Sequence, residues 1–391
     1  MVEYIQEEIM KYLLYKIAIL ILKIIYFFLK LLPTKNKITL ISRQSNEISI
    51  DFSLIKKEIL KHKKYKVVAL CKKLEGKEKA SLKNMFLYFF HMIRQMYHIA
   101  TSKVVILDSY CIAICVLKHK KNLRVIQIWH SIGTMKKFGY DILDQEEGNS
   151  SKIAKIMKMH QNYDVILCGG EGYREDLCRG FNCTKDKIRI IALPRVDLLL
   201  DKEYIKNIKN KIYNEYPMLM KKKNIVYCPT FRKDEKNMKK YVLDLINKVD
   251  YKKYNLIVKL HPLSTIKIDN KKVITAPTFS SAELLTIADY VITDYSCILY
   301  EAGILNKPLY FYAFDYEEYN KNRSLNIDYY KELPGVISNN IMDILNDIKN
   351  NKYDYLKLNK FINKYINLEG NNTKKIYSLI EEMIKNERKK E

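Results

Sequence analysis

Short apolar runs, rich in β-branched residues, recur from residue 37 onward and alternate with stretches of helical periodicity. Runs of this length are typical of buried strands in a parallel sheet. In the first half we predict strands at residues 38–41, 67–70, 104–107, 125–128, 165–167 and 188–191, and helices that include residues 84–100 and 171–179. In the second half we predict strands at residues 225–228, 256–260, 273–274, 291–293 and 309–311. This alternation indicates an α/β protein with doubly wound parallel sheets.

The alternation is interrupted at residues 194–197, where a Lys-rich helical segment begins that runs to about residue 223. A chain of 391 residues is also too long for one ordinary hydrophobic core. We therefore predict two α/β domains, at residues 36–200 and 201–391, and the second of them ends in helical sequence from about residue 342.

Residues 1–35 hold the most apolar stretch of the chain, but lysines interrupt it, and no uncharged run exceeds six residues. A membrane span needs ~20 apolar residues. Lys16, Lys23 and Lys30 fall on one side of a helix, which is the pattern of an amphipathic helix lying in a membrane interface. We expect a peripheral protein at the cytoplasmic face of the membrane; a helix that packs on the protein body or dimerises is the alternative. No cleavage site follows, so secretion is not expected.

The charge balance predicts anionic partners. The chain has 69 Lys and Arg against 44 Asp and Glu, a formal net charge of +25. Nucleic acid, an anionic membrane surface or phosphorylated substrates would all fit such a charge. The basic residues are mostly lysines spread along the chain, which disfavours sequence-specific DNA reading through arginine. Nucleic acid is therefore not the partner we expect.

The eight cysteines show no metal-binding or disulfide pattern. None belongs to a C-x-x-C pair, and no histidine stands at zinc-finger spacing. Several lie within apolar strand-like runs, where cysteine behaves as a small hydrophobic residue. We predict reduced thiols and no metal site.

Four polar clusters follow predicted strands, at residues 129–131, 229–232, 261–262 and 294–296. In open α/β sheets, ligands bind at the carboxyl ends of the strands. The clusters are rich in His, Arg, Ser and Thr, which are residues that bind anions and move protons. Together they predict an active site for an anionic ligand.

In the first half, the candidate chemistry centres on His130, which follows a strand and precedes a loop with Ser131, Gly133 and Lys136. A histidine of near-neutral pKa can take a proton from an attacking hydroxyl. A structural or merely exposed histidine is the alternative.

In the second half, Arg232 offers bidentate pairing to a phosphate, with Thr230 beside it, although a basic surface turn would look the same. His261 could donate to a phosphate oxygen. Ser296 and Cys297 precede a predicted helix, whose free N–H groups favour anions. A capping role for Asp294 and Ser296 is the alternative.

These clusters resemble the motifs of the CDP-glycerol glycerophosphotransferase family, whose members build teichoic-acid polymers. The matching segments read WHSIGTMKKFG at residues 129–139, PTFR at 229–232, HP at 261–262, ITDYSCILYE at 292–301 and NKPLYFY at 306–312. The turn at residues 194–197 and the Asp-x-x-x-Tyr spacing at 315–319 are similar too. Two departures are Ser131, where the family has Gly or Ala, and Cys297, where it has a second Ser.

The resemblance implies a GT-B-like fold, with two Rossmann-type domains facing a cleft and a membrane-docking N-terminal helix. It implies transfer of glycerol phosphate from CDP-glycerol to a hydroxyl of a lipid-linked acceptor, with release of CMP. The catalytic residues would be His130, as general base, and His261. The substrate-binding residues would be Ser131, Gly133, Lys136, Thr230, Arg232, Asp294, Ser296, Cys297 and Glu301. Arg232, His261 and Ser296 would hold the pyrophosphate, and Glu301 the ribose.

Several alternatives stay open at the level of sequence. The donor could be CDP-ribitol, or the enzyme could be a GT-B glycosyltransferase that uses a sugar nucleotide. A basic membrane- or nucleic-acid-binding module without catalysis is the alternative of another class. The need for a divalent cation is also open: Asp294 could touch one near the pyrophosphate, although the sequence shows no ligand cluster.

Overall fold

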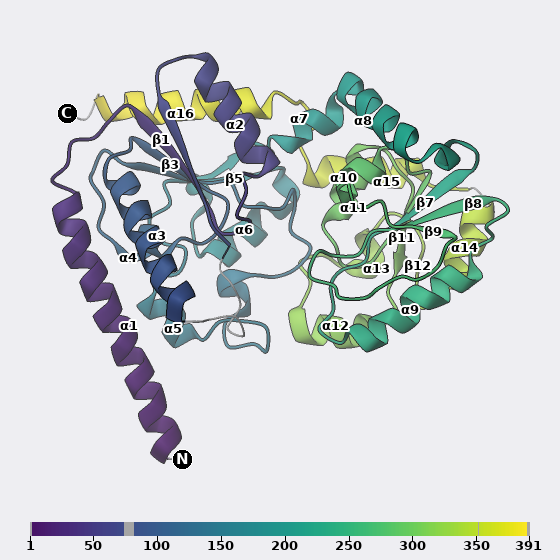
Figure 1. The fold of residues 1–391 in the computed structure, drawn as a ribbon, viewed down its shortest axis with the longest axis horizontal. Helices are drawn as coiled ribbons and strands as arrows, with labels where there is room; N and C mark the ends of the chain where they lie inside the picture. The colour runs from purple at the N-terminus through teal and green to yellow at the C-terminus, as the bar shows by residue number, and fades with distance from the viewer. Residues whose placement is uncertain (1, 74–81, 351, 389–391) are drawn as a thin grey trace.

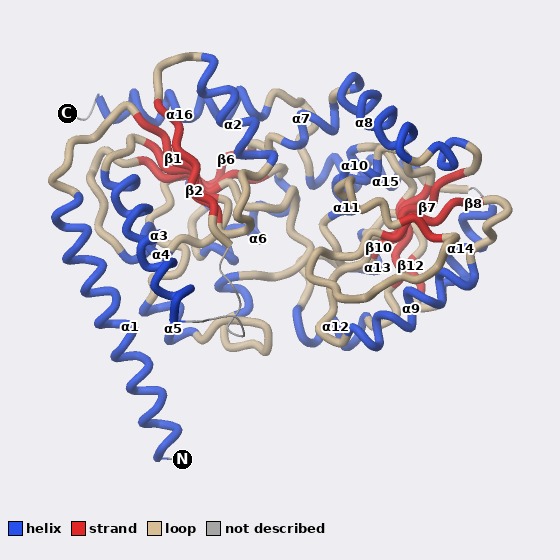
Figure 2. The backbone as a smooth tube through the Cα atoms, in the orientation of Figure 1, coloured by secondary structure: helices blue, strands red, loops and turns tan. Residues whose placement is uncertain are grey.

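The computed structural model describes residues 2–73, 82–350 and 352–388. The chain forms two lobes, each built around a six-stranded parallel sheet with helices packed around it (Figure 1). Figure 2 shows the two sheets as separate groups of strands, one at the centre of each lobe. The predicted pair of parallel α/β sheets is confirmed.

The first lobe carries the strand order β2-β1-β3-β4-β5-β6. All neighbouring strands pair in parallel, with Leu40 of β1 opposite both Ala69 and Ile106. The bounds are β1 Lys37–Ser42, β2 Lys66–Cys71, β3 Val104–Leu107, β4 Arg124–Gln127, β5 Val165–Cys168 and β6 Ile188–Ile190. Each of the six strands predicted in this half is present, within one or two residues at its ends.

The second lobe carries the order β12-β11-β10-β7-β8-β9. The bounds are β7 Lys223–Tyr227, β8 Tyr254–Val258, β9 Val273–Ile274, β10 Tyr290–Thr293, β11 Leu309–Tyr312 and β12 Ile337–Ser338. The sequence pattern predicted five of these strands and missed β12, which has two half-buried residues and therefore no apolar run to reveal it. Residues 225–227 and 291–292 are almost completely buried, so helices cover both faces of this sheet.

The helices follow the expected alternation. Those of the first half are α1 Val2–Leu29, α2 Ile50–Lys61, α3 Leu82–Ala100, α4 Ile112–Val116, α5 Ser151–Ile156, α6 Arg174–Phe181, α7 Arg195–Leu200 and α8 Lys202–Glu215. Those of the second half are α9 Glu235–Lys248, α10 Ser281–Leu285, α11 Ile298–Ile304, α12 Tyr316–Arg323, α13 Tyr329–Glu332, α14 Ile341–Asn350, α15 Tyr355–Tyr365 and α16 Asn372–Arg388.

The C-terminal helix α16 lies on the first lobe, although the sequence division placed residues 201–391 in the second. It packs against α2 and α7 (Figure 1), and Lys64 of the first lobe pairs with its Glu381 at 2.9 Å. The chain therefore crosses between the lobes twice, once near α7 and once just before α16. Local periodicity shows that α16 is a helix, but it carries no information about which lobe the helix covers.

The N-terminal helix α1 packs along the first lobe by one face. Leu22 and Tyr26 are buried, and the Tyr26 hydroxyl lies 2.8 Å from Nδ1 of His119. The window Tyr12–Leu29 has a mean hydropathy of 2.1, so by length and composition alone this helix could cross a membrane. Ile19, Leu22 and Tyr26 are covered by protein, but only 17% of this window is buried, so most of the helix surface is left open.

Candidate active site

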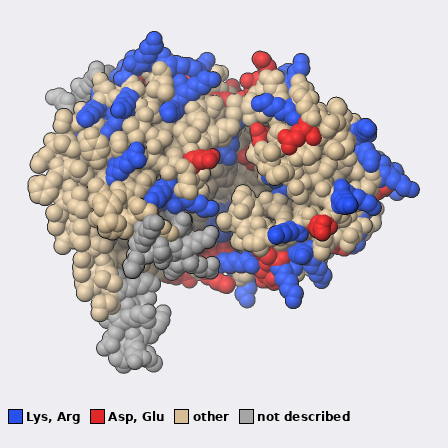
Figure 3. Space-filling model, in the orientation of Figure 1, with Lys and Arg blue, Asp and Glu red and all other residues tan. Residues whose placement is uncertain are grey.

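The two lobes meet where the loop after β4 contacts the start of α11. The Cys297 thiol donates to the Gly133 carbonyl at 3.6 Å, and the Tyr300 hydroxyl donates to the Thr134 carbonyl at 3.4 Å. A Cβ atom on Gly133 would lie 2.5 Å from the Tyr300 ring, so only glycine allows this approach. The surface is hollowed between the lobes (Figure 3), and we call this hollow the inter-lobe groove. Residues 133–134 of the first lobe meet Cys297 and Tyr300 of the second at the boundary between the lobes. We predict that His130, Lys136, His261 and Ser296 line the groove.

His130 stands at the carboxyl end of β4 with its side chain accessible to solvent. The preceding Trp129 has a left-handed backbone (φ 63°), an uncommon conformation for this residue type that turns the chain sharply out of the strand. The Trp129 ring is anchored against Phe138 and Phe181 at centroid distances of 4.4 and 5.3 Å. The partly buried aromatic ring thus fixes the turn, and the histidine after it is presented at the surface.

The environment of His130 suits a proton acceptor. Its Nδ1 lies 3.3 Å from the Asp108 carbonyl oxygen, which can only accept a hydrogen bond. The side-chain amide nitrogen of Gln44 lies 3.4 Å from the same Nδ1. In the tautomer that donates from Nδ1 to the Asp108 carbonyl, Nε2 is left free to act as a base. Although solvent reaches the ring, surrounding protein desolvates it, and this burial together with the positive charge of Arg195 lowers the pKa of His130 to about 4. The imidazole is therefore neutral at pH 7.

His261 follows β8, is exposed, and carries the opposite hydrogen-bonding arrangement. The backbone N–H of Leu263 donates to its Nδ1 at 3.2 Å, so in the neutral ring the proton lies on Nε2. Burial and the positive charges of Lys136 and Lys73 lower the pKa of His261. Both lysines belong to the first lobe, so His261 faces across the groove. Its Nε2–H is a hydrogen-bond donor, suited to an anionic oxygen.

Lys136 supplies positive charge between the lobes. Its ammonium group lies 5.3 Å from the centroid of the Tyr319 ring, and its backbone pairs with Leu325 of the second lobe in an isolated bridge. Burial lowers the pKa of Lys136 to about 8, so the side chain is still charged at pH 7. Ser131, half-buried in the same loop, hydrogen-bonds to Cys297 and lowers the pKa of that thiol, which burial otherwise raises.

Arg232 does not point into the groove as a free phosphate ligand. Its guanidinium binds Asp315 through Nε at 2.6 Å, Asp294 through NH2 at 2.8 Å and the Thr230 carbonyl through NH1 at 2.8 Å. The side chain is 9% exposed, with the Tyr295 and Tyr319 rings 5.0 and 4.6 Å from it. Burial alone would lower the pKa of Arg232, but the two carboxylates raise it. This closed network supports the loops of the second lobe, and the predicted pairing of Arg232 with phosphate stays a prediction.

Asp294 and Thr230 belong to the same network. Asp294 is completely buried and accepts hydrogen bonds from the Thr230 N–H at 2.8 Å and the Tyr295 N–H at 2.6 Å, besides the bond from Arg232. The Thr230 hydroxyl oxygen is buried without a hydrogen-bond partner among the described residues. Ser296 accepts from the N–H of Ile298 at 3.4 Å, but the N-cap residue of α11 is Cys297, so Ser296 lies one residue before the cap.

Glu301 lies at the junction of the lobes rather than on an open donor surface. It is 8% exposed, and its carboxylate is 3.6 Å from NH1 of Arg195. Burial raises the pKa of Glu301 to about 7, the nearby Arg195 opposes this, and Asp51 adds to it. The Glu301 carboxylate thus faces Arg195 rather than an open surface, and its predicted contact with a ribose stays a prediction.

Arg195 and Asp315 belong to motifs matched in the sequence, but no role was predicted for either residue. The structure makes Arg195 the partner of Glu301 and Asp315 the partner of Arg232. The matched motifs pointed to both residues. The motifs could not identify the partners of these residues, because the partners lie in distant segments of the chain.

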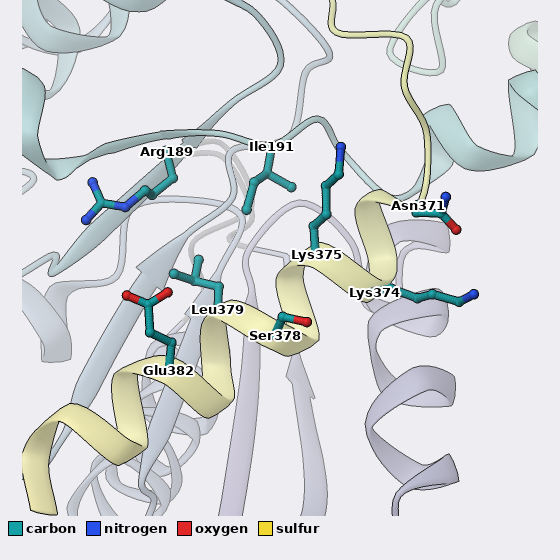
Figure 4. Close-up of a pocket in the computed structure, with 8 residues that line it drawn as sticks. All are labelled: Arg189, Ile191, Asn371, Lys374, Lys375, Ser378, Leu379 and Glu382. Atoms are coloured by element: carbon teal, nitrogen blue, oxygen red, sulfur yellow. The ribbon is translucent and has the colours of Figure 1, made fainter.

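Other candidate features lie away from the groove. Among residues 2–73, 82–350 and 352–388, no group of three or more His, Cys, Asp or Glu side chains is placed to hold a metal ion. Figure 4 shows a shallow pocket of about 330 Å³ between α16 and residues 189–191, lined by Arg189, Ile191, Asn371, Lys374, Lys375, Ser378, Leu379 and Glu382. It contains none of the predicted site residues, so it is not the candidate active site.

Comparison with known proteins agrees with this arrangement. A sequence model of the family described as CDP-glycerol:poly(glycerophosphate) glycerophosphotransferase matches residues 24–382. The chain is 28% identical over 362 residues to the teichoic acid ribitol-phosphate primase of Bacillus spizizenii, covering 90% of this chain and 92% of that protein. It is 31% identical over 306 residues to the teichoic acid glycerol-phosphate primase of Bacillus subtilis, covering 75% and 77%.

The fold has a solved counterpart. The structure of the wall teichoic acid polymerase TagF superposes with a TM-score of 0.71 at 20% sequence identity, covering 97% of this chain and 98% of that chain. The GT-B-like fold predicted from the sequence is thereby confirmed. Because the family model spans most of the chain, this protein belongs to the CDP-glycerol:poly(glycerophosphate) glycerophosphotransferase family and is a polyol-phosphate transferase of the teichoic acid primase and polymerase type.

Proposed function

We propose that the protein transfers glycerol phosphate from CDP-glycerol to a hydroxyl of a membrane-linked acceptor in teichoic-acid or related surface-polymer synthesis. The observation that carries this proposal is the pair of histidines of opposite tautomer at one groove. His130 offers a bare Nε2 to a hydroxyl proton, whereas His261 offers an Nε2–H to a phosphate oxygen. Lys136 adds a positive charge beside them.

In the proposed reaction, Nε2 of His130 takes the proton of the acceptor hydroxyl. The acceptor oxygen forms a bond to the phosphorus that carries the glycerol. The bond from that phosphorus to the bridging oxygen breaks, and CMP leaves with the electron pair. Such transfer needs positioning and stabilisation of charge more than covalent catalysis. His261, Lys136 and Ser296 are the groups proposed to stabilise the diphosphate.

Asp294, the residue suggested from the sequence as a contact for a divalent cation near the pyrophosphate, already has protein partners. The Asp294 carboxylate accepts three hydrogen bonds, all from protein groups, and the side chain is fully buried. If a cation takes part, its ligands lie elsewhere, and no step above depends on one.

The test of the proposal is release of CMP from CDP-glycerol by the full chain in the presence of a lipid-linked acceptor. The His130→Ala variant should lose turnover by about 10²-fold or more, the usual contribution of a general base, while still being stabilised by CDP-glycerol in a thermal-shift assay. His62→Ala is the matched control, because His62 stacks on Tyr377 of α16, on the side of the first lobe that α2 and α16 cover. Wild-type activity in His130→Ala would contradict the assignment of the base.

CDP-ribitol is the second candidate donor, because the match to the ribitol-phosphate primase covers more of this chain than the match to the glycerol-phosphate primase. Parallel assays with CDP-glycerol, CDP-ribitol and UDP-sugars separate the candidates. Release of UDP would favour a glycosyltransferase. Salt-sensitive DNA binding without stabilisation by any donor would favour a binding module.

The location we propose is the cytoplasmic face of the membrane, with α1 lying in the interface. Leu13, Leu20 and Phe27 form a line along α1 and are 51%, 57% and 59% exposed. Lys16, Lys23 and Lys30 form a second line beside it. Phe86 and Phe90 of the neighbouring α3 are also exposed, at 63% and 52%. An apolar surface flanked by lysines suits an anionic lipid surface.

A further inference from the structure

The turn at residues 194–197, where the chain first leaves the first lobe, is tied to both lobes by charged side chains. Asp51 of α2 accepts three hydrogen bonds from Arg195: from its backbone N–H at 2.9 Å, from Nε at 2.8 Å and from NH2 at 2.5 Å. Asp51 is 2% exposed. Removing one partner of such a desolvated pair leaves a buried charge, so Arg195 is firmly fixed to the first lobe.

The other end of the guanidinium reaches the second lobe more loosely. NH1 of Arg195 lies 3.6 Å from a carboxylate oxygen of Glu301 on α11, which is an ion pair without a hydrogen bond. Glu301 is on the helix whose first residues approach the groove, and Tyr300 beside it packs on Gly133. The ion pair thus connects Arg195 to the helix that meets the loop of residues 133–134.

The same turn also holds the second crossing of the chain. Asp197 accepts from the backbone N–H groups of Asn372 and Thr373, both at 2.9 Å, and from their side chains at 2.9 and 2.8 Å. These residues begin α16, which returns to the first lobe. Both connections between the lobes thus converge on residues 194–197.

We propose that Arg195 is a positioning residue for the transfer reaction, holding α11 of the second lobe in register with His130 of the first through the Asp51–Arg195–Glu301 chain. This inference rests on the proposed function of the groove. Arg195 touches neither donor nor acceptor in this account. It acts through the alignment of two surfaces and through its positive charge, which is close enough to affect His130. A misplacement of about 1 Å at such a site can cost about 10²-fold in rate.

The decisive variant is Glu301→Gln, assayed above pH 7 where Glu301 is mostly ionised, because it leaves the Asp51–Arg195 pair intact and removes only the charge across the lobes. We expect kcat to fall about tenfold or more while the affinity for CDP-glycerol changes less than about twofold. A ribose-binding role for Glu301 would instead weaken donor affinity. Arg189→Gln is the matched control, since Arg189 is an exposed arginine of the first lobe that bonds only to nearby carbonyl groups. Unchanged kcat in Glu301→Gln would overturn the proposal.

A second readout does not depend on turnover. Titration of the His130 ring by NMR, assigned with His130→Ala, should show a higher pKa in Arg195→Gln than in the wild type, by about half a unit or more, because a nearby positive charge is lost. Arg195→Lys keeps the charge and should restore the His130 pKa but only part of kcat, because lysine cannot reproduce the paired bonds to Asp51. Loss of thermal stability in Arg195→Gln with an unchanged His130 pKa would reduce Arg195 to a structural role and contradict the proposal.

The two experiments also separate this inference from the function on which it rests. If the wild type and Arg189→Gln release no CMP from any CDP-polyol, the proposed function fails, and the His130 titration still decides whether Arg195 acts on the base. If both release CMP and Glu301→Gln does so equally well, the function stands and the positioning role falls.

Discussion

The two lobes share one architecture but use the ends of their strands differently. In the first lobe, β4 ends in a left-handed Trp129 that leaves His130 accessible. In the second lobe, Arg232 in the loop after β7 forms an ion pair with Asp294 in the loop after β10. Arg232 also forms an ion pair with Asp315. Polar residues that follow strands of similar sheets are thus accessible at His130 and His261 but paired within the protein at Arg232 and Asp294.

The difference lies in how many hydrogen bonds each side chain already makes. Each of the three guanidinium nitrogens of Arg232 has a protein partner, whereas His130 has contacts at Nδ1 and an open Nε2. A phosphate arriving at Arg232 would have to replace two carboxylates, while a hydroxyl arriving at His130 replaces water. The first exchange is costly because both carboxylates would be left buried without their counter-charge.

The contrast predicts that Arg232 contributes mainly to stability and His130 mainly to activity. Arg232→Met should lower the free energy of unfolding by about 3–5 kcal/mol, because it leaves Asp294 and Asp315 as unpaired buried charges. His130→Ala should change it by less than about 0.5 kcal/mol, as is usual for an accessible side chain. Urea denaturation of both variants measures this. A fully stable Arg232→Met that cannot bind donor would mean that the guanidinium is a phosphate ligand after all.

Lys136 offers a second comparison with Arg232. It is a cation of the first lobe and, among the described residues, forms no ion pair with a carboxylate, whereas Arg232 forms two. Lys136→Met should weaken CDP-glycerol binding about tenfold or more, the contribution expected of a charged hydrogen bond. In the wild type, affinity should fall as pH rises through about 8, where Lys136 loses its proton, and the variant should lack this dependence. Calorimetric titration at pH 7 and pH 9 tests both points. Lys233→Met is the control, since its side chain is 81% exposed; an equal loss there would indicate a general charge effect.

The surface that we propose to face the membrane belongs to the first lobe. Lys23→Gln on α1 should weaken binding to anionic vesicles by about 1 kcal/mol, the usual contribution of one lysine near such a surface. Lys239→Gln on α9 of the second lobe should have no effect. Vesicle sedimentation at low and high salt measures this, and equal losses in both variants would show that the protein has no preferred docking lobe.

The smallest effect expected is in the acid range. Because burial and Arg195 lower the pKa of His130 to about 4 in the free enzyme, the base is fully deprotonated well above that pH. In the Glu301→Gln variant, which lacks the carboxyl group that titrates near pH 7, kcat/KM should therefore change less than about twofold between pH 5.5 and 7 and fall only as pH approaches 4. A decline centred near pH 6.5 in this variant would mean that His130 has an ordinary pKa or is not the base.

Most of the fold follows from local pattern. Buried parallel strands leave apolar runs that identify them, and eleven of the twelve strands were predicted from such runs, all except Ile337–Ser338. The return of α16 to the first lobe could not be predicted, because it depends on Asp197 capping a helix that begins at Asn372. Helical periodicity identifies an element without saying where it packs.

The candidate site was predictable as a set of residues but not as a set of roles. Strand-end position predicted His130 and His261 as site residues, and the loop that follows His130 added Lys136; this assignment stays a prediction. Strand-end position could not distinguish these residues from Arg232 or Glu301, whose partners Asp315 and Arg195 come from other segments. Whether a charged side chain is free or paired is a property of tertiary contact, which residue type and spacing do not encode.

The most direct test of the central claim is a structure of the His130→Ala variant, which should bind donor without consuming it, soaked with CDP-glycerol. The account predicts a diphosphate within hydrogen-bonding distance of His261 and Ser296, and room for a hydroxyl about 3–3.5 Å from the distal phosphorus on the side of residue 130. A donor bound outside the inter-lobe groove, or a phosphorus turned away from the first lobe, would contradict it.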